Sequence, residues 1–250
     1  MSIFEPTTLA RRDDETEVFA VPAGVRVLAA RLDLAAADVA ALAARLSPEE
    51  VERAQRCRFP RDRRRYVVAR AHLRRLLGER LGIPAEAVRL AGGEHGKPCL
   101  GGDQAASGWH FNLSRCGELA LFALARDRRV GIDLEAVREV RGADHIVEHF
   151  FSRRERAAYR TLGAGDKLRG FLNCWTRKEA FVKAVGAGLA YPYDCFDVSL
   201  APGEPAQLLR VGERRGEDTG WRLDAFVPRP GFVAAVVCEM QPSSNSEILP

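Results

Sequence analysis

The order of apolar and polar residues in the first half of the chain predicts a strand, three helices and a hairpin. Helical segments are indicated where apolar residues recur on one face, and strands where apolar residues run together or alternate with polar ones. A Ser-Pro-Glu-Glu signal marks the start of a helix, and a Gly with a Pro shortly after it marks the end of another. The expected elements are a strand over 25–32, helices over 34–46, from Ser47 and over 61–81, and a hairpin of 109–113 with 119–125.

The pattern then starts again in the second half. Another strand is followed by helical periodicity and by two apolar runs that favour a closing hairpin. The expected elements are a strand over 129–135, helices over 143–150, 152–162 and 166–185, and a hairpin of 221–227 with 232–239.

The two halves resemble each other in sequence as well as in the order of elements. Segment 117–124 (GELALFAL) is similar to segment 231–238 (GFVAAVVC) at an offset of 114, and the ends of the long helices, 76–78 and 184–186, match at an offset of 108. Such offsets indicate a tandem duplication. The chain is therefore predicted to be an α+β pseudo-dimer of two strand-helices-hairpin halves, with a ligand site between them.

The predicted boundaries follow from the repeat. We expect an N-terminal half over 18–126, a C-terminal half over 127–240, and flexible ends over 1–17 and 241–250.

Composition excludes disorder, collagen and coiled coil, since 46% of the 250 residues are apolar and 29% are charged. A net charge of +4 is too mild to indicate nucleic acid. The arginines are unevenly spread, however: Arg53 to Arg80 holds eleven of them against Asp62 and Glu79. This segment is expected to bind something anionic.

Cysteine spacing and hydropathy bear on location. The six cysteines lie far apart without zinc-ligand spacing, which favours reduced thiols in a cytoplasmic protein. The first residues include acids before any long apolar run, and no run approaches about 20 residues, so neither export nor a membrane partner is expected.

Two carboxylates end the strand at 131–135. Side chains alternate along a strand, so Asp133 and Glu135 project from the same face. At a separation of about 7 Å they repel by about 2 kcal/mol, which favours either solvent exposure or a bound cation. Oxygen ligands alone select Mg²⁺ or Mn²⁺ rather than zinc.

The last long helix carries Trp175, Glu179 and Lys183 on one stripe, at positions i, i+4 and i+8. A surface Glu–Lys pair would explain the charges alone. The Trp and the apolar residues around it instead indicate that the stripe borders the core.

Two further polar segments each allow a functional and a purely structural interpretation. His95-Gly96-Lys97-Pro98 follows glycines and could hold a phosphate or simply connect elements, and it lacks the helix and Ser/Thr of a P-loop. Segment 111–116 (FNLSRC) offers side-chain donors, although a turn also favours Asn and Ser.

Two other functions compete with these assignments. An Arg-rich helix could belong to a nucleic-acid-binding module, although the chain shows no aromatic stacking motif. His145, Glu148 and His149 fit the H-x-x-E-H pattern of zinc peptidases, and a solvated helix face explains the same pattern more simply.

Taken together and in order, five motifs resemble the Sfp-type 4'-phosphopantetheinyl transferases over nearly the whole chain. They are GKP (96–98), FNLSRC (111–116), GIDLE (131–135), HFFSRRE (149–155) and WTRKEAFVKAVGAGL (175–189). The resemblance implies the pseudo-dimeric fold of that family, with coenzyme A (CoA) and Mg²⁺ bound between the halves. It also implies a holo-carrier-protein synthase, which moves the phosphopantetheine arm of CoA to a serine of an apo acyl or peptidyl carrier protein. The second product is adenosine 3',5'-bisphosphate.

The resemblance assigns roles at matching positions. It implies that Glu179 is the base, assisted catalytically by Lys183 and Asp133, and that Glu155 lies behind the metal ligands. The implied metal ligands, for Mg²⁺ or Mn²⁺, are Asp133, Glu135 and Glu179. The implied CoA ligands are Arg53, Arg56, Lys97, Asn112, Ser114, Arg115 and Lys183.

One position departs from the family. Ser-His-Ser is usual where this chain has Ser114-Arg115-Cys116. Arginine can hold a phosphate bidentately but cannot lose its proton. Acid–base chemistry is therefore not expected at this position, and an altered preference for CoA is expected.

The other arginines of 53–80 are expected on a solvated helix face, where they could attract an acidic carrier protein. Two fused halves predict a monomer.

Overall fold

The computed structural model describes residues 16–19 and 24–240, and its N-terminal half contains every element predicted there. Three short strands, β1, β3 and β4, were not predicted. The elements are β1 (Thr16–Phe19), β2 (Val25–Arg31), α1 (Ala36–Ala43), α2 (Pro48–Gln55), α3 (Pro60–Leu81), β3 (Leu90–Gly92), β4 (Pro98–Leu100), β5 (Trp109–Cys116) and β6 (Leu119–Arg126).

The C-terminal half likewise confirms the predicted strand, helices and hairpin, and adds the short strands β8, β9 and β10. Its elements are β7 (Val130–Ala136), α4 (Ala143–Phe150), α5 (Arg153–Thr161), α6 (Lys167–Val185), β8 (Phe196–Val198), β9 (Leu208–Val211), β10 (Arg214–Arg215), β11 (Trp221–Phe226) and β12 (Phe232–Glu239).

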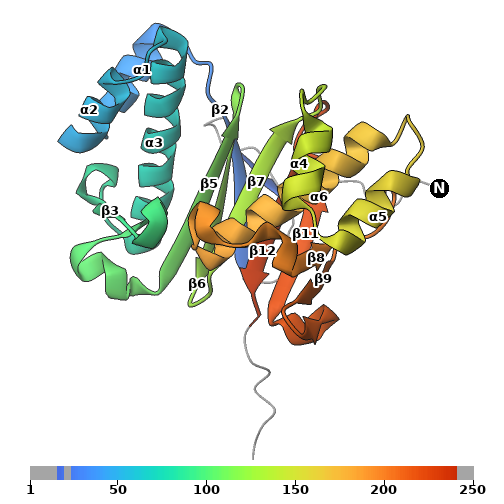
Figure 1. Ribbon diagram of the computed structural model, residues 1–250. Coiled ribbons are helices and arrows are strands. Elements are labelled where there is room, and N and C mark those ends of the chain that lie inside the picture. Colours follow the sequence, from blue (N-terminus) through green and yellow to red (C-terminus); the bar gives the residue numbers. More distant parts are fainter. Residues whose placement is uncertain (1–15, 20–23, 241–250) are drawn as a thin grey trace, which may run out of the picture.

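Both halves have the same strand order, which confirms the α+β pseudo-dimer. The N-terminal sheet runs β1-β2-β6-β5, and the C-terminal sheet runs β11-β12-β7, so β2, β6 and β5 correspond to β7, β12 and β11. Figure 1 shows α1–α3 on one side of the molecule, α4–α6 on the other, and β5 and β7 between them. The division at 126/127 stays a prediction. The predicted ends 1–17 and 241–250 lie outside the described residues, except that 16 and 17 begin β1.

Three apolar clusters build this arrangement. One packs α3 against one face of the N-terminal sheet, and a second packs α6 against the C-terminal sheet. The third joins the inner faces of both sheets, with Val27 and Leu121 on one side and Ile132 and Val236 on the other. The halves are therefore held together by a shared core.

The structure corrects both predicted offsets of the repeat. Strands β2 and β7 begin 105 residues apart, and the left-handed Gly82 and Gly186 end the long helices 104 apart, not 108. The equivalent strands β6 and β12 lie 113 residues apart, not 114. Ala120 of β6 and Val233 of β12 are equivalent because each faces the long helix of its own half. A shift of one residue would turn the strand over.

A buried ion pair joins two helices of the N-terminal half. Ser47 and Glu50 form a capping box at the start of α2, and Glu50 also accepts hydrogen bonds from Arg70 (2.6 Å) and Arg74 (2.5 Å) of α3. Arg74 is only 2% exposed. The prediction of a solvated face was therefore wrong for Arg74, whose charge lies inside the half.

The C-terminal half has an equivalent capping box and buried ion pair about 105 residues later. Ser152 and Glu155 form a capping box at the start of α5, and Glu155 pairs with Lys178 of α6 at 2.8 Å. Val198 also donates its backbone N–H to Glu155. Glu155 thus belongs to the scaffold, and its expected place behind the metal ligands stays a prediction.

Candidate active site

The helix α6 lies unusually close to β7, and Gly131 makes this possible. A Cβ at Gly131 would lie 2.1 Å from the Ala180 carbonyl oxygen and 2.3 Å from the Ala184 nitrogen. Only glycine permits such an approach of two backbones. It brings Glu179 and Lys183 of α6 against the strand that carries Asp133.

Asp133 is the centre of a polar contact between the two halves. It is 3% exposed, and its Oδ1 accepts hydrogen bonds from Lys183 Nζ (2.5 Å) and Ser114 Oγ (3.1 Å). Since Ser114 lies on β5 and Lys183 on α6, the predicted residues of both halves meet here.

Asn112 strengthens the same junction. Its Oδ1 accepts a hydrogen bond of 2.8 Å from the backbone nitrogen of Ile132, so β5 is joined to β7 through a side chain. Asn112 also lines a cavity with Glu179 and Lys183.

Burial and neighbouring carboxylates raise the pKa of two glutamates at the site. Burial, and then the charge of Asp133, raises the pKa of Glu135 to about 7. Burial also raises the pKa of Glu179, with a further contribution from Asp133, while Tyr193 acts in the opposite direction. A shared cation would relieve this repulsion.

Tyr193 is a site residue that the sequence did not reveal. Its hydroxyl donates a 2.6 Å hydrogen bond to Glu179 Oε1. The ring is 5% exposed and lies between Trp175, which it stacks on, and Phe150, which it meets edge-on. Residues 191–193 (YPY) have no periodicity that would have placed this hydroxyl beside α6.

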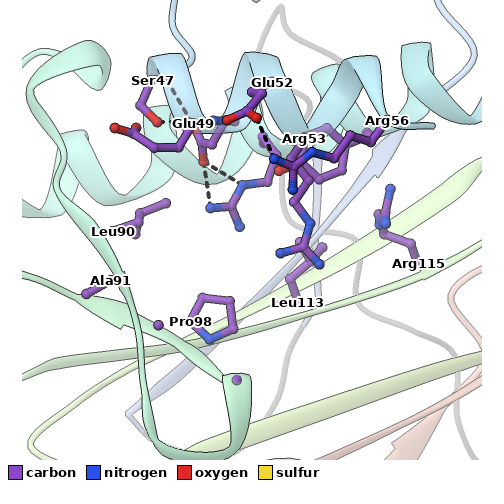
Figure 2. A pocket seen from close by; sticks show the side chains of 15 residues that line it. Ser47, Glu49, Glu52, Arg53, Arg56, Leu90, Ala91, Pro98, Leu113 and Arg115 are labelled. Carbon is purple, nitrogen blue, oxygen red and sulfur yellow. Dashed lines mark hydrogen bonds and ion pairs between the residues drawn. The ribbon is translucent and has the colours of Figure 1, made fainter.

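A basic cavity of about 590 Å³ opens in the N-terminal half. Figure 2 shows α2 above it, carrying Arg53 and Arg56, and Leu113 and Arg115 of β5 below. A second cavity, of about 300 Å³, is lined by Glu179, Lys183 and Tyr193. The two cavities share Gly96, Pro98 and Leu113, and so form one groove that crosses from the first half to the second.

The four arginines that line the basic cavity differ in their contacts, and Arg70 pairs with Glu50. Arg56 pairs with Glu52 one turn earlier, and Arg115 lies 5.6 Å from the centre of the Tyr66 ring. No ion pair to the guanidinium of Arg53 occurs among residues 24–240. Arg53 is thus the cation with most capacity for an incoming anion.

The contacts of Lys97 differ from those expected of a CoA ligand. Its ammonium donates to the carbonyl oxygens of Val130 (2.9 Å), Lys183 (2.5 Å) and Ala184 (3.4 Å). Burial lowers the pKa of Lys97 to about 8. As placed, its charge holds the end of α6 against β7 and is not free for a phosphate.

Two family models together match most of the chain. The family model described as the 4'-phosphopantetheinyl transferase superfamily matches residues 129–237, and one described as 4'-phosphopantetheinyl transferase, N-terminal, matches residues 35–126. The chain is 36% identical over 232 residues to the 4'-phosphopantetheinyl transferase HetI of Nostoc sp., covering 93% of this chain and 91% of that protein. The chain belongs to the 4'-phosphopantetheinyl transferase superfamily.

Other relatives of this transferase carry related names. The human L-aminoadipate-semialdehyde dehydrogenase-phosphopantetheinyl transferase is 32% identical over 217 residues, which cover 81% of this chain and 70% of that protein. A crystal structure of Thermotoga maritima holo-[acyl-carrier-protein] synthase aligns with a TM-score of 0.33 and 22% identity, over 45% of this chain and 63% of that one. The family match shows that the chain is an enzyme, a phosphopantetheinyl transferase.

The residues of this transferase fit a hard divalent cation. Asp133 Oδ2 is buried and has no hydrogen-bond partner, and its neighbours Glu135 and Glu179 supply only oxygen. In the described residues no three Asp, Glu, His or Cys side chains already converge on one point as metal ligands. For Asp133, Glu135 and Glu179 all to bind one cation, at least one of these side chains would have to turn.

The zinc-peptidase pattern has other contacts in the transferase. His149 Nδ1 lies 2.8 Å from the His145 carbonyl oxygen, and the two rings stack 4.0 Å apart. Glu148 pairs with Arg160. The motif thus lies on an exposed helix face, apart from the groove.

Among the described residues, no helix is long and apolar enough to cross a membrane.

Proposed function

We propose that this transferase moves the 4'-phosphopantetheine arm of CoA to a serine hydroxyl of an apo carrier protein, with Mg²⁺, and releases adenosine 3',5'-bisphosphate. One observation carries the proposal: a single groove runs from Arg53 and Arg115 to Glu179 and Lys183. Its cationic end suits a nucleotide phosphate, and its carboxylate end suits phosphoryl transfer.

The 3'-phosphate of CoA binds at the cationic end. Arg53 and Arg56 face the cavity from α2, and Arg115 faces it from β5. Charge-assisted hydrogen bonds from guanidinium groups hold a phosphate in a fixed orientation. Arg115 acts here only as a donor, since it keeps its proton.

Glu179 accepts the proton of the carrier serine. Burial raises its pKa, which strengthens the carboxylate as a base near neutral pH. Tyr193 holds Oε1, so Oε2 faces the reacting groups. Lys183 then steadies the negative charge on the bridging phosphates.

The cation site joins Asp133, Glu135 and Glu179. These residues would hold Mg²⁺, or Mn²⁺, which would neutralise the CoA diphosphate and stabilise the leaving group. Ser114 and Asn112 keep β5 beside this site through Asp133 and Ile132.

We further propose that the enzyme acts as a cytoplasmic monomer. Both halves of one chain supply groove residues, so a second copy is not needed to complete the site. All six cysteines are free, which suits a reducing compartment.

The proposal is tested by weighing a carrier protein after incubation with the enzyme, CoA and Mg²⁺. A mass gain of one phosphopantetheine is expected, and EDTA should prevent it. The absence of any gain across acyl, peptidyl and aminoadipate carriers would contradict the proposal.

A further inference from the structure

Arg177 is a buried cation without a counter-charge. It is 4% exposed, and burial lowers its pKa to about 10. Every other buried Lys, Arg, Asp or Glu side chain of residues 24–240 contacts an opposite charge. The pairs are Glu50 with Arg70 and Arg74, Asp133 with Lys183, Glu155 with Lys178, and Asp197 with Arg210.

Hydrogen bonds satisfy only one end of the Arg177 guanidinium. Its Nη1 donates to the carbonyl oxygen (2.5 Å) and the hydroxyl (2.9 Å) of Ser199. Its Nε is buried with no partner, and no hydrogen bond to Nη2 occurs among the described residues. The guanidinium therefore keeps hydrogen-bonding capacity that its protein contacts do not use.

A cavity lies beside Arg177. Its volume is about 370 Å³, and it lies between the first half of α6, the loop at 202–204 and the turn between β11 and β12. Arg177 and Arg169 line it together with Asn173, Phe226 and Val227. No residue of this lining also lines the groove of the active site.

Glu204 does not supply the missing charge. It lines the same cavity, but its side chain is exposed and accepts a hydrogen bond from the backbone of Ala201. No Glu204 oxygen lies within ion-pair distance of Arg177, although the two interact weakly through space. A buried charge without such a partner is unfavourable, and a bound anion would remove the penalty.

We propose that this cavity is a second anion site, in which Arg177 binds a carboxylate or phosphate group of a small molecule. Arg169 adds positive charge at the rim, and Phe226 and Val227 contact the apolar remainder of the ligand. Because Arg177 and Ser199 join α6 to the segment after β8, occupancy of the site stabilises the helix that carries Glu179.

The test measures thermal unfolding of the full chain with the active-site groove saturated by CoA, without Mg²⁺. Sodium phosphate and sodium acetate are compared with sodium chloride at equal ionic strength. Phosphate or acetate should raise the Tm by about 3 °C at ten times its Kd. The arm with the larger rise identifies the preferred oxyanion.

Two variants separate the site from general salt effects. Arg177→Met should lose the anion-specific rise, whereas Arg214→Gln removes one exposed arginine outside the cavity and should keep it. Should Arg177→Met fail to fold, wild-type crystals soaked in selenate should show anomalous density at Arg177. An equal rise in Arg177→Met and wild type, no rise in the wild type, or no selenate at Arg177 would overturn the proposal.

Discussion

The two halves share one scaffold, and only the C-terminal half carries the carboxylates proposed to bind the cation and accept the proton. At the positions of Asp133 and Glu135, 105 residues earlier, the N-terminal half has the buried Leu28 and Ala30. At the positions of Glu179 and Lys183, 104 residues earlier, it has Arg75 and Glu79, a surface pair of reversed order. The equivalent strand positions are therefore apolar core in one half and carboxylates in the other, and the equivalent helix positions hold an ion pair in one half and groove residues in the other.

The buried ion pairs show the opposite trend, since both halves keep them. Glu50 with Arg74 and Glu155 with Lys178 each join a capping box to the long helix. The comparison indicates that these charges hold the helices in place, whereas we propose that the charges facing the groove perform the chemistry. Variants at equivalent positions can break this distinction.

The largest effect is expected at the base. Glu179→Gln removes the proton acceptor with little change in shape and should lower kcat by about 10²–10⁴-fold. Steady-state transfer to a carrier protein measures it. Arg75→Gln, at the equivalent position of the other half, is the matched control and should keep kcat near the wild-type value. Loss of activity in both variants would remove the distinction between the halves.

The buried pairs should dominate stability in both halves. Lys178→Met leaves the buried Glu155 unpaired and should lower the free energy of unfolding by about 3–5 kcal/mol. Arg74→Met leaves the buried Glu50 with Arg70 as its remaining partner and should also lower the free energy of unfolding, by a smaller amount. Urea unfolding provides the measurement. Arg214→Gln, an exposed change, should fall within about 0.5 kcal/mol of wild type. A small effect of Lys178→Met beside a large effect of Arg74→Met would show that only one half depends on its pair.

Loss of a cation at the other end of the groove should affect binding alone. Arg53→Gln should raise the KM for CoA about tenfold or more, because a charge-assisted bond to phosphate is lost, with kcat little changed. The control is 3'-dephospho-CoA, for which wild type and Arg53→Gln should have equal KM. A KM that rises equally for both substrates would place the 3'-phosphate elsewhere.

The smallest effect is expected at Tyr193, which acts through Glu179. Tyr193→Phe removes one hydrogen bond of about 1 kcal/mol and should lower kcat about fivefold while the KM for CoA stays constant. Tyr191→Phe, a nearby tyrosine that makes no contact with Glu179, is the control. A change in KM alone would assign Tyr193 to binding instead of base orientation.

The sequence predicted the long elements well, because their apolar periodicity is strong and their ends carry capping signals. Helix α4 lies at its predicted bounds, and α3 begins one residue early. Strands β8 to β10 have two to four residues each, too few to show alternation. The predicted helix offset failed because Gly78 lies inside α3, where the Ile83 carbonyl approaches it closely, and does not end the helix.

The site was predictable in its residues and not in its contacts. Asp133 and Glu179 stand in recognisable motifs, and the structure brings them together. The ion pair of Lys178 and the carbonyl contacts of Lys97 depend on partners that are distant in sequence, so a motif does not reveal which lysine faces inward. Arg177, inside the same motif as Glu179, is buried against Ser199 for the same reason.

A crystal structure of the enzyme with CoA and Mg²⁺ tests most directly the claim that one groove spans both halves. The account predicts the 3'-phosphate of CoA at Arg53 and Arg115, and the diphosphate beside Lys183 with Mg²⁺ bound by Asp133. A CoA molecule whose 3'-phosphate lies away from the α2 arginines, or whose diphosphate lies away from Asp133 and Glu179, would contradict it.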